Sequence, residues 1–452
     1  MYQPKKIIIV GGNAAGPSAA AKAKRVNPDA EVTLFEAGEF ISTGTCELPY
    51  LLSNDIDDYK KIIFFTPESF QKEKGVKVYN NTFVKGIDRK RKSISVVYKF
   101  TNLVKEFEYD KLILTTGSSA IELDTLPYSL DNVFSLKSVH DYLKINKFIS
   151  SHDISNVLVV GAGYIGLEVA DALNSAGYKV SIFEKSTYPL PSADVEIQEL
   201  IKDSISTSGI NFLPGNAKTR FIISNNSMKE FNYNGRFLNF DLVIVAAGVK
   251  ANNWLAQEAN LKLGNYGGLV VDNRLKTSDP NIYAAGDNIE VQNLISKKRD
   301  YIPLATHAHS FGHTAGENAA GGNKIIDPVL LNSTFKFGNN FVAQIGLNQK
   351  QTDESFPNSD YVTSIAQNKV KVMPNSNKVF GKVIFDKYSG LILGASFLGA
   401  EEVSGYADII ATMIQNKIPA KNLSKIKFNY TPPLSPFVNL LSILGRKIEE
   451  KS

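Results

Sequence analysis

This chain of 452 residues contains one cysteine, and two glycine-rich turns flank it in the sequence. Cys46 stands in the segment Ile41–Tyr50, between the turns Gly11–Gly16 and Gly161–Gly166. Glycines in such a turn let the backbone approach the pyrophosphate of a dinucleotide. A thiolate reacts to give a mixed disulfide or a sulfenic acid. Two nucleotide sites and one thiol suggest flavin redox chemistry at sulfur, against the plainer alternative of a small buried side chain.

The first turn lies within a strand–turn–helix–strand pattern over residues 6–36. Residues 6–10 and 31–35 are rich in β-branched and other apolar side chains, which predicts two strands, and the alanine-rich stretch 17–26 predicts a helix. Glu36, after the second strand, can accept hydrogen bonds from a ribose hydroxyl. The nucleotide contacts predicted here are Gly11, Asn13 (in place of a middle glycine), Ala14, Gly16 and Glu36.

The second turn repeats this pattern, with strands predicted at 156–160 and 179–183 and a helix at 167–176. Its fingerprint is complete, with glycine at all three positions: Gly161, Gly163 and Gly166. The carboxylate of Glu184 pairs with a free ribose 2′-hydroxyl and repels a 2′-phosphate, which favours NADH over NADPH. Lys185 follows directly and weakens this preference, so NADPH stays open.

Later segments indicate how the chain divides into domains. Apolar strands that run into a glycine are predicted within 109–117, 240–248 and 277–287. From residue 331 the pattern changes to β-rich segments at 335–345, 361–373 and 378–386 and a helix at 402–415. We predict an α/β fold with two Rossmann-like dinucleotide-binding domains, the second inserted into the first, and a C-terminal α+β domain. The predicted boundaries are 1–118 with 251–330 for the first domain, 119–250 for the second and 331–452 for the third.

The bulk composition excludes several classes of protein. With 43% apolar and 21% charged residues the chain is typical of a soluble globular protein, and its formal charge of +5 is too small and too spread to predict nucleic-acid binding. No stretch approaches the ~18 apolar residues of a membrane span. The apolar run 7–10 is too short for a secretory signal. A single cysteine excludes internal disulfides, and we expect a reducing cytoplasm as its setting.

The motifs follow one another in a specific order along nearly the whole chain. The order is fingerprint, cysteine segment, Thr116–Gly117, complete fingerprint with Glu168, Gly248, then Gly286–Asp287. It resembles that of the flavin-dependent pyridine nucleotide–disulfide oxidoreductases, above all their single-cysteine branch, which holds coenzyme A-disulfide reductase, NADH oxidase and NADH peroxidase. The resemblance implies FAD in the first domain, NADH or NADPH in the second, and a homodimer formed through residues 331–452, with active sites shared between the subunits.

The resemblance also implies roles for single residues. Asp287 would contact the FAD ribitol, Tyr164 would gate the nicotinamide pocket, and Glu168 would lie near the nicotinamide. Further cofactor contacts implied in this way are Val84, Thr116, Gly117, Ile165, Gly248 and Gly286. The coenzyme A contacts of the family map to Ser18, Lys22, Arg25 and Ser42. Beside the catalytic Cys46, Tyr430 from the partner subunit would protonate or orient a departing thiolate.

Three observations sort the members of this family. One cysteine and the absence of any histidine after His313 exclude the branch that resembles glutathione reductase. Ala14 stands where the peroxidase and the oxidase carry a histidine, which favours coenzyme A-disulfide reductase. Met373 stands where those reductases have a second active-site tyrosine, and this departure keeps the oxidase and the peroxidase as alternatives.

Two further features lie close to the expected site. A carboxylate facing the sulfur would raise the pKa of the thiol, and we expect Glu47 to face away, because neighbours in a strand or turn usually point apart. His307, His309 and His313 look like metal ligands in their spacing. We expect no metal there, and a polar role near the flavin or the substrate channel stays open.

The residues and the resemblance together predict an FAD-dependent enzyme that passes hydride from NAD(P)H through the flavin to Cys46. The cysteine would reduce coenzyme A disulfide or a related low-molecular-weight disulfide, persulfide or polysulfide. An NADH oxidase or peroxidase that cycles through a Cys46 sulfenic acid is the first alternative. A flavoprotein reductase of a protein electron carrier is the second.

Overall fold

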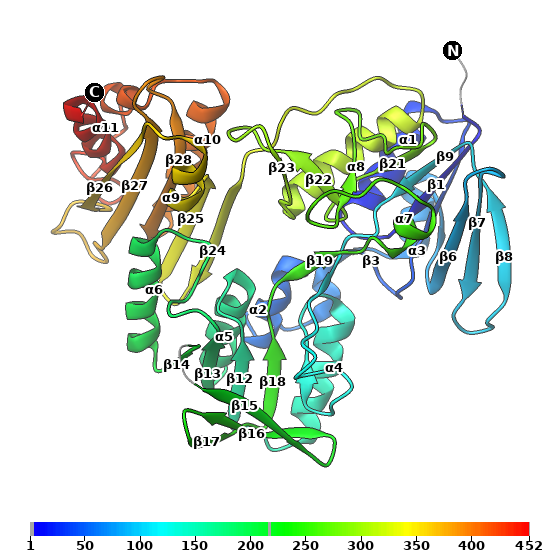
Figure 1. Ribbon diagram of the computed structural model, residues 1–452, viewed down its shortest axis with the longest axis horizontal. Coiled ribbons are helices and arrows are strands. Elements are labelled where there is room, and N and C mark those ends of the chain that lie inside the picture. The colour runs from blue at the N-terminus through cyan, green and yellow to red at the C-terminus, as the bar shows by residue number, and fades with distance from the viewer. Residues whose placement is uncertain (1–3, 216–217, 452) are drawn as a thin grey trace.

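The computed structural model describes residues 4–215 and 218–451 (Figure 1). Residues 1–3, 216–217 and 452, which the predicted domain boundaries include, lie outside the described residues. Figure 1 shows two α/β units and, on the opposite side from the N-terminus, a C-terminal unit coloured yellow to red. Within the described ranges, no helix combines the length and the apolarity that a bilayer crossing requires.

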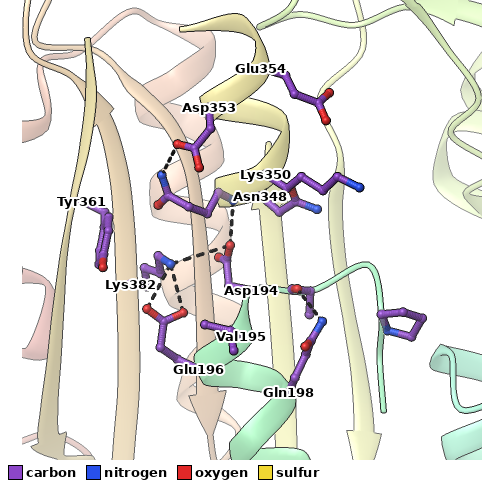
Figure 2. A pocket seen from close by; sticks show the side chains of 13 residues that line it. Asp194, Val195, Glu196, Gln198, Asn348, Lys350, Asp353, Glu354, Tyr361 and Lys382 are labelled. Atoms are coloured by element: carbon purple, nitrogen blue, oxygen red, sulfur yellow. Dashed lines mark hydrogen bonds and ion pairs between the residues drawn. The ribbon is translucent and has the colours of Figure 1, made fainter. Parts of the chain in front are cut away.

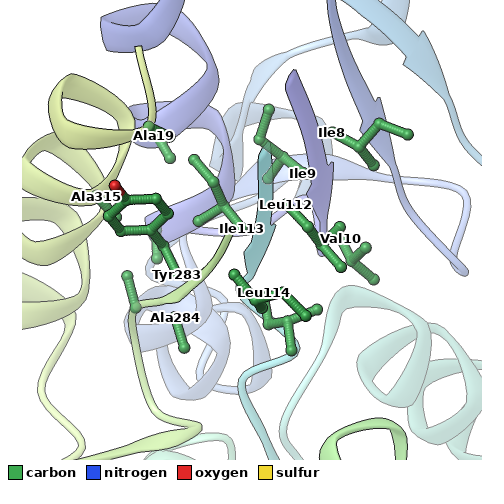
Figure 3. Packing of buried hydrophobic residues seen from close by; sticks show 14 of the residues in the cluster. Ile8, Ile9, Val10, Ala19, Leu112, Ile113, Leu114, Tyr283, Ala284 and Ala315 are labelled. Atoms are coloured by element: carbon green, nitrogen blue, oxygen red, sulfur yellow. The ribbon is translucent and has the colours of Figure 1, made fainter. Parts of the chain in front are cut away.

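The first unit is built on a five-stranded parallel sheet in the order β21-β9-β1-β2-β5. Its strands are β1 (Lys6–Val10), β2 (Glu31–Phe35), β5 (Lys77–Tyr79), β9 (Lys111–Leu114) and β21 (Ile282–Ala284). Parallel strands are covered on both faces, which explains their continuous apolar sequences. Figure 3 shows Ile9 and Ile113 near Tyr283 in this core. The strands predicted at 6–10 and 31–35 are confirmed as β1 and β2.

Two helices of this unit, one from each end of its sequence, pack closely together. They are α1 (Ala15–Val26) and α8 (Ala305–Ala319). A Cβ atom on Gly312 would collide with the carbonyl group of Ala15, and a Cβ on Gly316 with that of Ala19. The glycines of α8 and the alanines of α1 therefore permit a helix contact that larger residues would prevent. This contact fixes the start of α1, whose first two residues, Ala15 and Gly16, close the first glycine turn.

The second unit repeats the parallel sheet, in the order β11-β18-β12-β13-β14. Its strands are β11 (Val133–Phe134), β12 (Asn156–Val160), β13 (Lys179–Glu184), β14 (Asn211–Pro214) and β18 (Leu242–Val245), and its helices are α4 (Val139–Ser151), α5 (Tyr164–Ser175) and α6 (Val195–Ser208). The helix predicted at 167–176 begins earlier, at Tyr164, because Gly163 is its N-cap.

The second unit is inserted into the first. The chain enters and leaves it through a two-stranded antiparallel ribbon, formed by β10 (Ser118–Ala120) and β19 (Val249–Ala251). Gly117 and Gly248 precede these strands with φ values of 65° and 107°, which favour glycine. The ribbon joins the two nucleotide units, while the exact domain boundaries stay predictions.

Smaller elements complete the two units. One meander consists of β6 (Thr82–Asp88), β7 (Ser93–Tyr98) and β8 (Val104–Glu108), and the other of β15 (Thr219–Ser224), β16 (Ser227–Tyr233) and β17 (Arg236–Asn239). The short elements are β3 (Ile41–Thr43), α2 (Leu48–Leu52), β4 (Ile63–Phe65), α3 (Pro67–Lys74), α7 (Trp254–Glu258), β20 (Leu269–Val270), β22 (Ile289–Gln292) and β23 (Arg299–Asp300).

The C-terminal unit is an antiparallel sheet in the order β24-β25-β28-β27-β26. Its elements are β24 (Asn332–Phe337), β25 (Asn340–Gly346), α9 (Gln349–Ser355), β26 (Ser359–Gln367), β27 (Lys378–Asp386), β28 (Ile392–Gly399), α10 (Glu402–Gln415) and α11 (Leu440–Lys451). Helices α10 and α11 pack on it. Phe335, Phe337 and Leu398 of the sheet belong instead to the apolar core of the second unit, so the two units share a core.

Two predicted strands of this unit have different bounds in the structure. The segment 335–345 is divided between β24 and β25, because Gly338 adopts a positive φ of 58° in the turn between them. The segment 361–373 ends as a strand at Gln367. There the side chain of Asn368 accepts a hydrogen bond from the backbone N–H of Asn377 and closes a turn that contains Met373.

Candidate active site

The two glycine turns have the same geometry. Gly11 and Gly161 adopt φ values of 110° and 106°, which only glycine tolerates readily. A Cβ on Gly16 would collide with the carbonyl oxygen of Gly11, and a Cβ on Gly166 with that of Gly161. Each turn places free backbone N–H groups at the start of a helix, where a pyrophosphate binds. Both turns therefore fit a dinucleotide.

A carboxylate braces each turn in the same way. Glu36 accepts hydrogen bonds from the backbone N–H groups of Gly12 and Gly38, both at 2.6 Å. Glu184 accepts hydrogen bonds from the backbone N–H groups of Ala162 and Ser186, both at 2.9 Å. Burial raises the pKa of Glu36, and its backbone hydrogen bonds oppose this shift. Each acid stands beside its turn, where the ribose of a bound dinucleotide would lie.

Asn13 and Ala14 join the first turn to its surroundings. The side-chain oxygen of Asn13 accepts a hydrogen bond of 2.9 Å from the backbone N–H of Thr43, so this residue ties the turn to the cysteine segment. Ser42, on the same short strand, donates its backbone N–H to Gly12 at 2.8 Å. Ala14, at the N-cap of α1, has a φ of 28°, in the region that favours glycine. Asn13, at the middle position of the fingerprint, therefore links the first glycine turn to the strand before Cys46.

Buried polar atoms lie beside Gly286, at the same edge of the sheet as the first glycine turn, because a Cβ on Gly286 would meet the side chain of Ala15. Gly286 has a φ of 95°, and Asp287 accepts a hydrogen bond of 2.8 Å from the hydroxyl of Ser118. The side-chain oxygens of Asn288 and Tyr301 are buried, and neither has a hydrogen-bond partner among the residues that the structure describes. Buried polar atoms without partners are costly unless a ligand or water satisfies them. These residues fit an extended polar ligand such as FAD.

The remaining expected cofactor residues differ in exposure. Thr116 donates its hydroxyl to the carbonyl of Asn252 at 2.8 Å and thus holds the crossing between the units. Val84 is buried in the core of the first unit, on β6, where it pairs with Val96. Ile165, near the start of α5, is 39% exposed and lies next to the second turn. Of the two apolar residues expected to contact a cofactor, Val84 and Ile165, only Ile165 is therefore accessible from solvent.

Cys46 stands in a 3₁₀ turn over Thr45–Glu47, directly before α2, and it is free and exposed. Its surface is open to solvent, yet the protein around it is dense enough to raise the pKa of the thiol by desolvation. The charges of Glu47, Glu168 and Asp287 raise this pKa further, and Lys137 opposes them. Glu168 belongs to α5 and Asp287 follows β21, so the thiol lies where the two nucleotide units approach each other.

The position of the Glu47 side chain bears on the expectation that it faces away from the sulfur, which stays a prediction. The residues around Cys46 form a 3₁₀ turn, in which neighbours do not alternate as they do in a strand. The carboxylate of Glu47 folds back over Gly44, where a Cβ would collide with it. From there its charge contributes to the raised pKa of the Cys46 thiol.

Glu168 and Lys137 complete the electrostatic setting of the thiol. Burial raises the pKa of Glu168 to about 7. Lys137, on the loop before α4, forms an ion pair with Asp287 at 3.4 Å. No sequence motif contains this lysine, so sequence reasoning missed it. Asn288 was also missed, although it directly follows the Gly–Asp motif.

The predicted coenzyme A residues on α1 contact α8. The hydroxyl of Ser18 donates to the carbonyl of His309 at 2.9 Å, and Lys22 pairs with Glu317 at 3.0 Å. Arg25 is exposed at the end of the same helix. Burial lowers the pKa of His313, and the charges of Lys22, Lys324 and Arg25 lower it further. We call Lys22, Arg25, His313 and Lys324 the basic cluster.

The three histidines of α8 do not converge. His307 is partly buried, and its Nδ1 atom has no hydrogen-bond partner within the described ranges. His309 is exposed, and His313 belongs to the basic cluster. In the part of the chain that the structure describes, no three or more His, Cys, Asp or Glu side chains come together as a metal site.

The C-terminal tail carries exposed apolar side chains. Tyr430 is half exposed, and its ring packs in a T-shaped arrangement with that of Phe437, with ring centroids 5.5 Å apart. Leu434 and Phe437 are 77% and 82% exposed. Met373 lies in the turn between β26 and β27 and is next to the exposed Val372. A partner that covers this tail would bury these side chains.

Comparison with known proteins identifies the family. Residues 5–312 match the family model described as pyridine nucleotide-disulphide oxidoreductase, and residues 333–440 match that of its dimerisation domain. The chain is 30% identical to the NADH oxidase of Methanocaldococcus jannaschii over 449 residues, 99% of each chain. It is 28% identical to the coenzyme A disulfide reductase of Staphylococcus aureus over 443 residues, 98% of this chain and 99% of the relative.

Solved structures agree with these matches. Reduced Bacillus anthracis CoADR-RHD superimposes with a TM-score of 0.94 at 28% identity, covering 100% of this chain and 81% of that chain. The NAD-dependent persulfide reductase from A. fulgidus superimposes with a TM-score of 0.92 at 30% identity, covering 99% and 83%. With two nucleotide units, one inserted into the other, a C-terminal sheet and a family match over most of its length, the chain belongs to the pyridine nucleotide-disulphide oxidoreductase family of enzymes.

Proposed function

We propose that the chain is an FAD-dependent reductase that uses NAD(P)H to reduce coenzyme A disulfide, or a related low-molecular-weight disulfide, persulfide or polysulfide, at Cys46. One observation carries this proposal: the only thiol of the chain lies close to both nucleotide units. The charge of Glu168, on α5 of the second unit, and that of Asp287, after β21 of the first, both raise the pKa of this thiol. The names of the relatives, coenzyme A disulfide reductase and persulfide reductase, support the substrate class.

The two glycine turns would hold the two cofactors. The FAD contacts would be Gly11, Asn13, Ala14, Gly16, Glu36, Val84, Thr116, Gly117, Gly286 and Asp287, and those of NAD(P)H would be Gly161, Gly163, Tyr164, Ile165, Gly166, Glu168, Glu184 and Gly248. When bound, FAD takes hydride from the nicotinamide and makes an electron pair available for cleaving a disulfide. Glu184 supports NADH as the preferred donor, because its carboxylate repels a 2′-phosphate.

Cys46 would attack one sulfur of the substrate as a thiolate. The Cys46 sulfur forms a bond to that sulfur, the disulfide bond of the substrate breaks, and the first thiolate leaves. Two electrons then cleave the mixed disulfide, which frees the second thiolate and restores that of Cys46. One NADH and one proton are consumed for each disulfide, and NAD⁺ and two thiols are formed.

Three groups would manage charge and protons in this cycle. Desolvation and Glu47 raise the pKa of the Cys46 thiol, so Lys137, whose charge lowers it, would favour the thiolate. Tyr430 would reach the site from a second subunit and protonate the departing thiolate. The exposed tail and the match to a dimerisation domain support a homodimer with shared sites.

The substrate would lie along α1. Ser18, Lys22, Arg25 and Ser42 are the proposed coenzyme A contacts, and the basic cluster adds His313 and Lys324. The cations of this cluster, Lys22, Arg25 and Lys324, suit the phosphates of a coenzyme A thiol. The cytoplasmic setting expected from the single cysteine stays a prediction.

An NADH oxidase is the second candidate function, because the relative from Methanocaldococcus jannaschii bears that name. Cys46 would then cycle through a sulfenic acid, and Met373 in place of a tyrosine agrees with this alternative. A reductase of a protein electron carrier, with Cys46 uninvolved, is the third.

An anaerobic stopped-flow experiment separates these candidates. Under the proposal, NADH and coenzyme A disulfide turn over without oxygen, and Cys46→Ser abolishes the turnover. Turnover only after oxygen or peroxide is admitted supports the oxidase or the peroxidase. Undiminished activity of Cys46→Ser with a protein acceptor supports the third function. Mass spectrometry of the purified protein tests the substrate separately, since a coenzyme A adduct on Cys46 is expected.

A further inference from the structure

The side chain of Tyr164 leaves its own unit. It is the first residue of α5 and directly follows Gly163 of the second glycine turn. Its ring packs edge-on against Phe335 of β24, with ring centroids 4.9 Å apart, and its hydroxyl donates a hydrogen bond to the side-chain oxygen of Gln344 on β25. A residue at the mouth of a nucleotide turn is thus attached to the C-terminal sheet.

Gln344 is held in one orientation. Its residue is 5% exposed, in the middle of a strand whose flanking residues are Ala343 and Ile345. The amide nitrogen donates to the carbonyl of Ser192 at 3.1 Å, which leaves the amide oxygen for Tyr164. A buried amide in an apolar strand is costly unless it is hydrogen-bonded at both ends, and Gln344 meets this condition.

The loop that receives Gln344 is itself fixed to the C-terminal unit. The side-chain amide of Asn348 donates to the same Ser192 carbonyl at 2.8 Å, and the backbone N–H of Gln349 donates to Asp194 at 2.7 Å. Figure 2 shows Lys382 beside Asp194 and Glu196, with Lys382–Glu196 at 3.0 Å, at a cavity of about 600 Å³. Because this loop cannot move away from the sheet easily, Gln344 and Ser192 keep their spacing.

We propose that Gln344 is a catch that holds Tyr164 back against the C-terminal sheet and so keeps the nicotinamide end of the second nucleotide site clear. Gln344 is a positioning residue, since it acts through Tyr164. The inference rests on the proposed binding of NAD(P)H by the second unit. A tyrosine without its catch would spend part of its time in rotamers over the turn. The apparent affinity for the dinucleotide falls in proportion to the fraction of molecules that remain competent.

Two ligands distinguish this effect from general damage. NAD⁺ contains the nicotinamide half of the dinucleotide, whereas ADP-ribose contains only the other half. Calorimetric titration of the FAD-loaded, full-length enzyme gives the dissociation constant of each. We expect Gln344→Leu to weaken NAD⁺ binding about threefold to tenfold, the range that one neutral hydrogen bond supplies, and to leave ADP-ribose binding unchanged.

Further variants test whether Gln344 affects NAD⁺ binding through the side chain of Tyr164. Tyr164→Phe, which loses only the hydroxyl, should weaken NAD⁺ binding as Gln344→Leu does, and the two changes should not add. Adding Tyr164→Ala to Gln344→Leu should recover part of the NAD⁺ binding, because no ring remains to obstruct the site, although the contact of Tyr164 with the nucleotide is lost. Asn340→Ala is the matched control: it removes another hydrogen bond between β25 and the second unit, from Asn340 to Ser204 of α6, and should change neither affinity.

Every outcome of these titrations either supports or overturns the proposed role of Gln344. Unchanged or tighter NAD⁺ binding in Gln344→Leu and Tyr164→Phe overturns the catch, and so does an equal loss for ADP-ribose. The proposed function survives these results as long as the wild-type enzyme binds both ligands. If the wild-type enzyme binds neither, the nucleotide assignment fails and the catch fails with it. If Gln344→Leu does not fold, Tyr164→Phe carries the test alone.

Discussion

The Lys22 ammonium lies 3.0 Å from the Glu317 carboxylate and joins α1 to α8. Both side chains are partly exposed, at 18% and 26%. Lys22 is one of the cations proposed to face the phosphates of coenzyme A, so the enzyme places an anion within its own basic cluster. Glu317 therefore competes with the substrate for Lys22.

Replacing Glu317 with glutamine should improve the binding of an anionic substrate. The change frees Lys22 and removes a negative charge beside the basic cluster, so we expect the KM for coenzyme A disulfide to fall about twofold to fivefold at low salt. The KM for NADH should stay unchanged, and the gain should fade at high salt. Glu450→Gln, an exposed change on α11, is the control. A KM for coenzyme A disulfide that stays constant would mean that Lys22 does not contact the substrate.

The thiol pKa should respond in opposite directions to two neutralising changes. Glu47 raises the pKa of the Cys46 thiol and Lys137 lowers it. Glu47→Gln should therefore shift the pH profile of Cys46 alkylation in the reduced enzyme to lower pH, and Lys137→Gln should shift it to higher pH. The rate of iodoacetamide labelling, followed by mass spectrometry, measures both. Shifts in the same direction would refute the charge arrangement around the sulfur.

The contact between α1 and α8 should tolerate no side chain at Gly312. A Cβ there would collide with the carbonyl group of Ala15, next to the first glycine turn. We expect Gly312→Ala to destabilise the protein by about 2–4 kcal/mol and to weaken FAD retention, because α1 must shift. Gly405 of α10 has open space around it, so Gly405→Ala should be neutral or stabilising by up to about 1 kcal/mol. Thermal unfolding and the flavin content after gel filtration measure both effects.

The sequence predicted the elements that local stereochemistry determines. The conformations at Gly11 and Gly161, with φ values of 110° and 106°, require glycine, so the turns are visible in the residue pattern. The strands around them carry continuous apolar runs because both faces of a parallel sheet are buried. The same reasoning placed an acid at the end of each unit, and the structure has both acids bonded to their turns.

Contacts between distant residues left no pattern in the sequence. Tyr164 and Gln344 are 180 positions apart, and neither residue type indicates the partner of the other. Lys22 was predicted to face substrate from the resemblance to the family, which could not reveal Glu317 on another helix. The 3₁₀ turn of the cysteine segment, which the short sequence around it did not indicate, brings the Glu47 carboxylate back over Gly44. Such relationships depend on how the domains pack.

Glu168 should make the stability of the enzyme depend on pH. Burial raises the pKa of its carboxyl group to about 7 from an ordinary value of 4.5. The folded protein therefore binds more protons than the unfolded chain between these values, and this group costs stability as the pH rises through that window.

Glu168→Gln removes this cost. Its stabilising effect should be small at pH 5 and grow to at most about 3 kcal/mol at pH 8, the equivalent of the pKa shift. Thermal unfolding of the FAD-loaded enzyme at both pH values measures it, with the exposed Glu199→Gln on α6 as the control for losing one surface charge. An equal gain in stability at pH 5 and pH 8 would show that the Glu168 carboxyl does not titrate in this window.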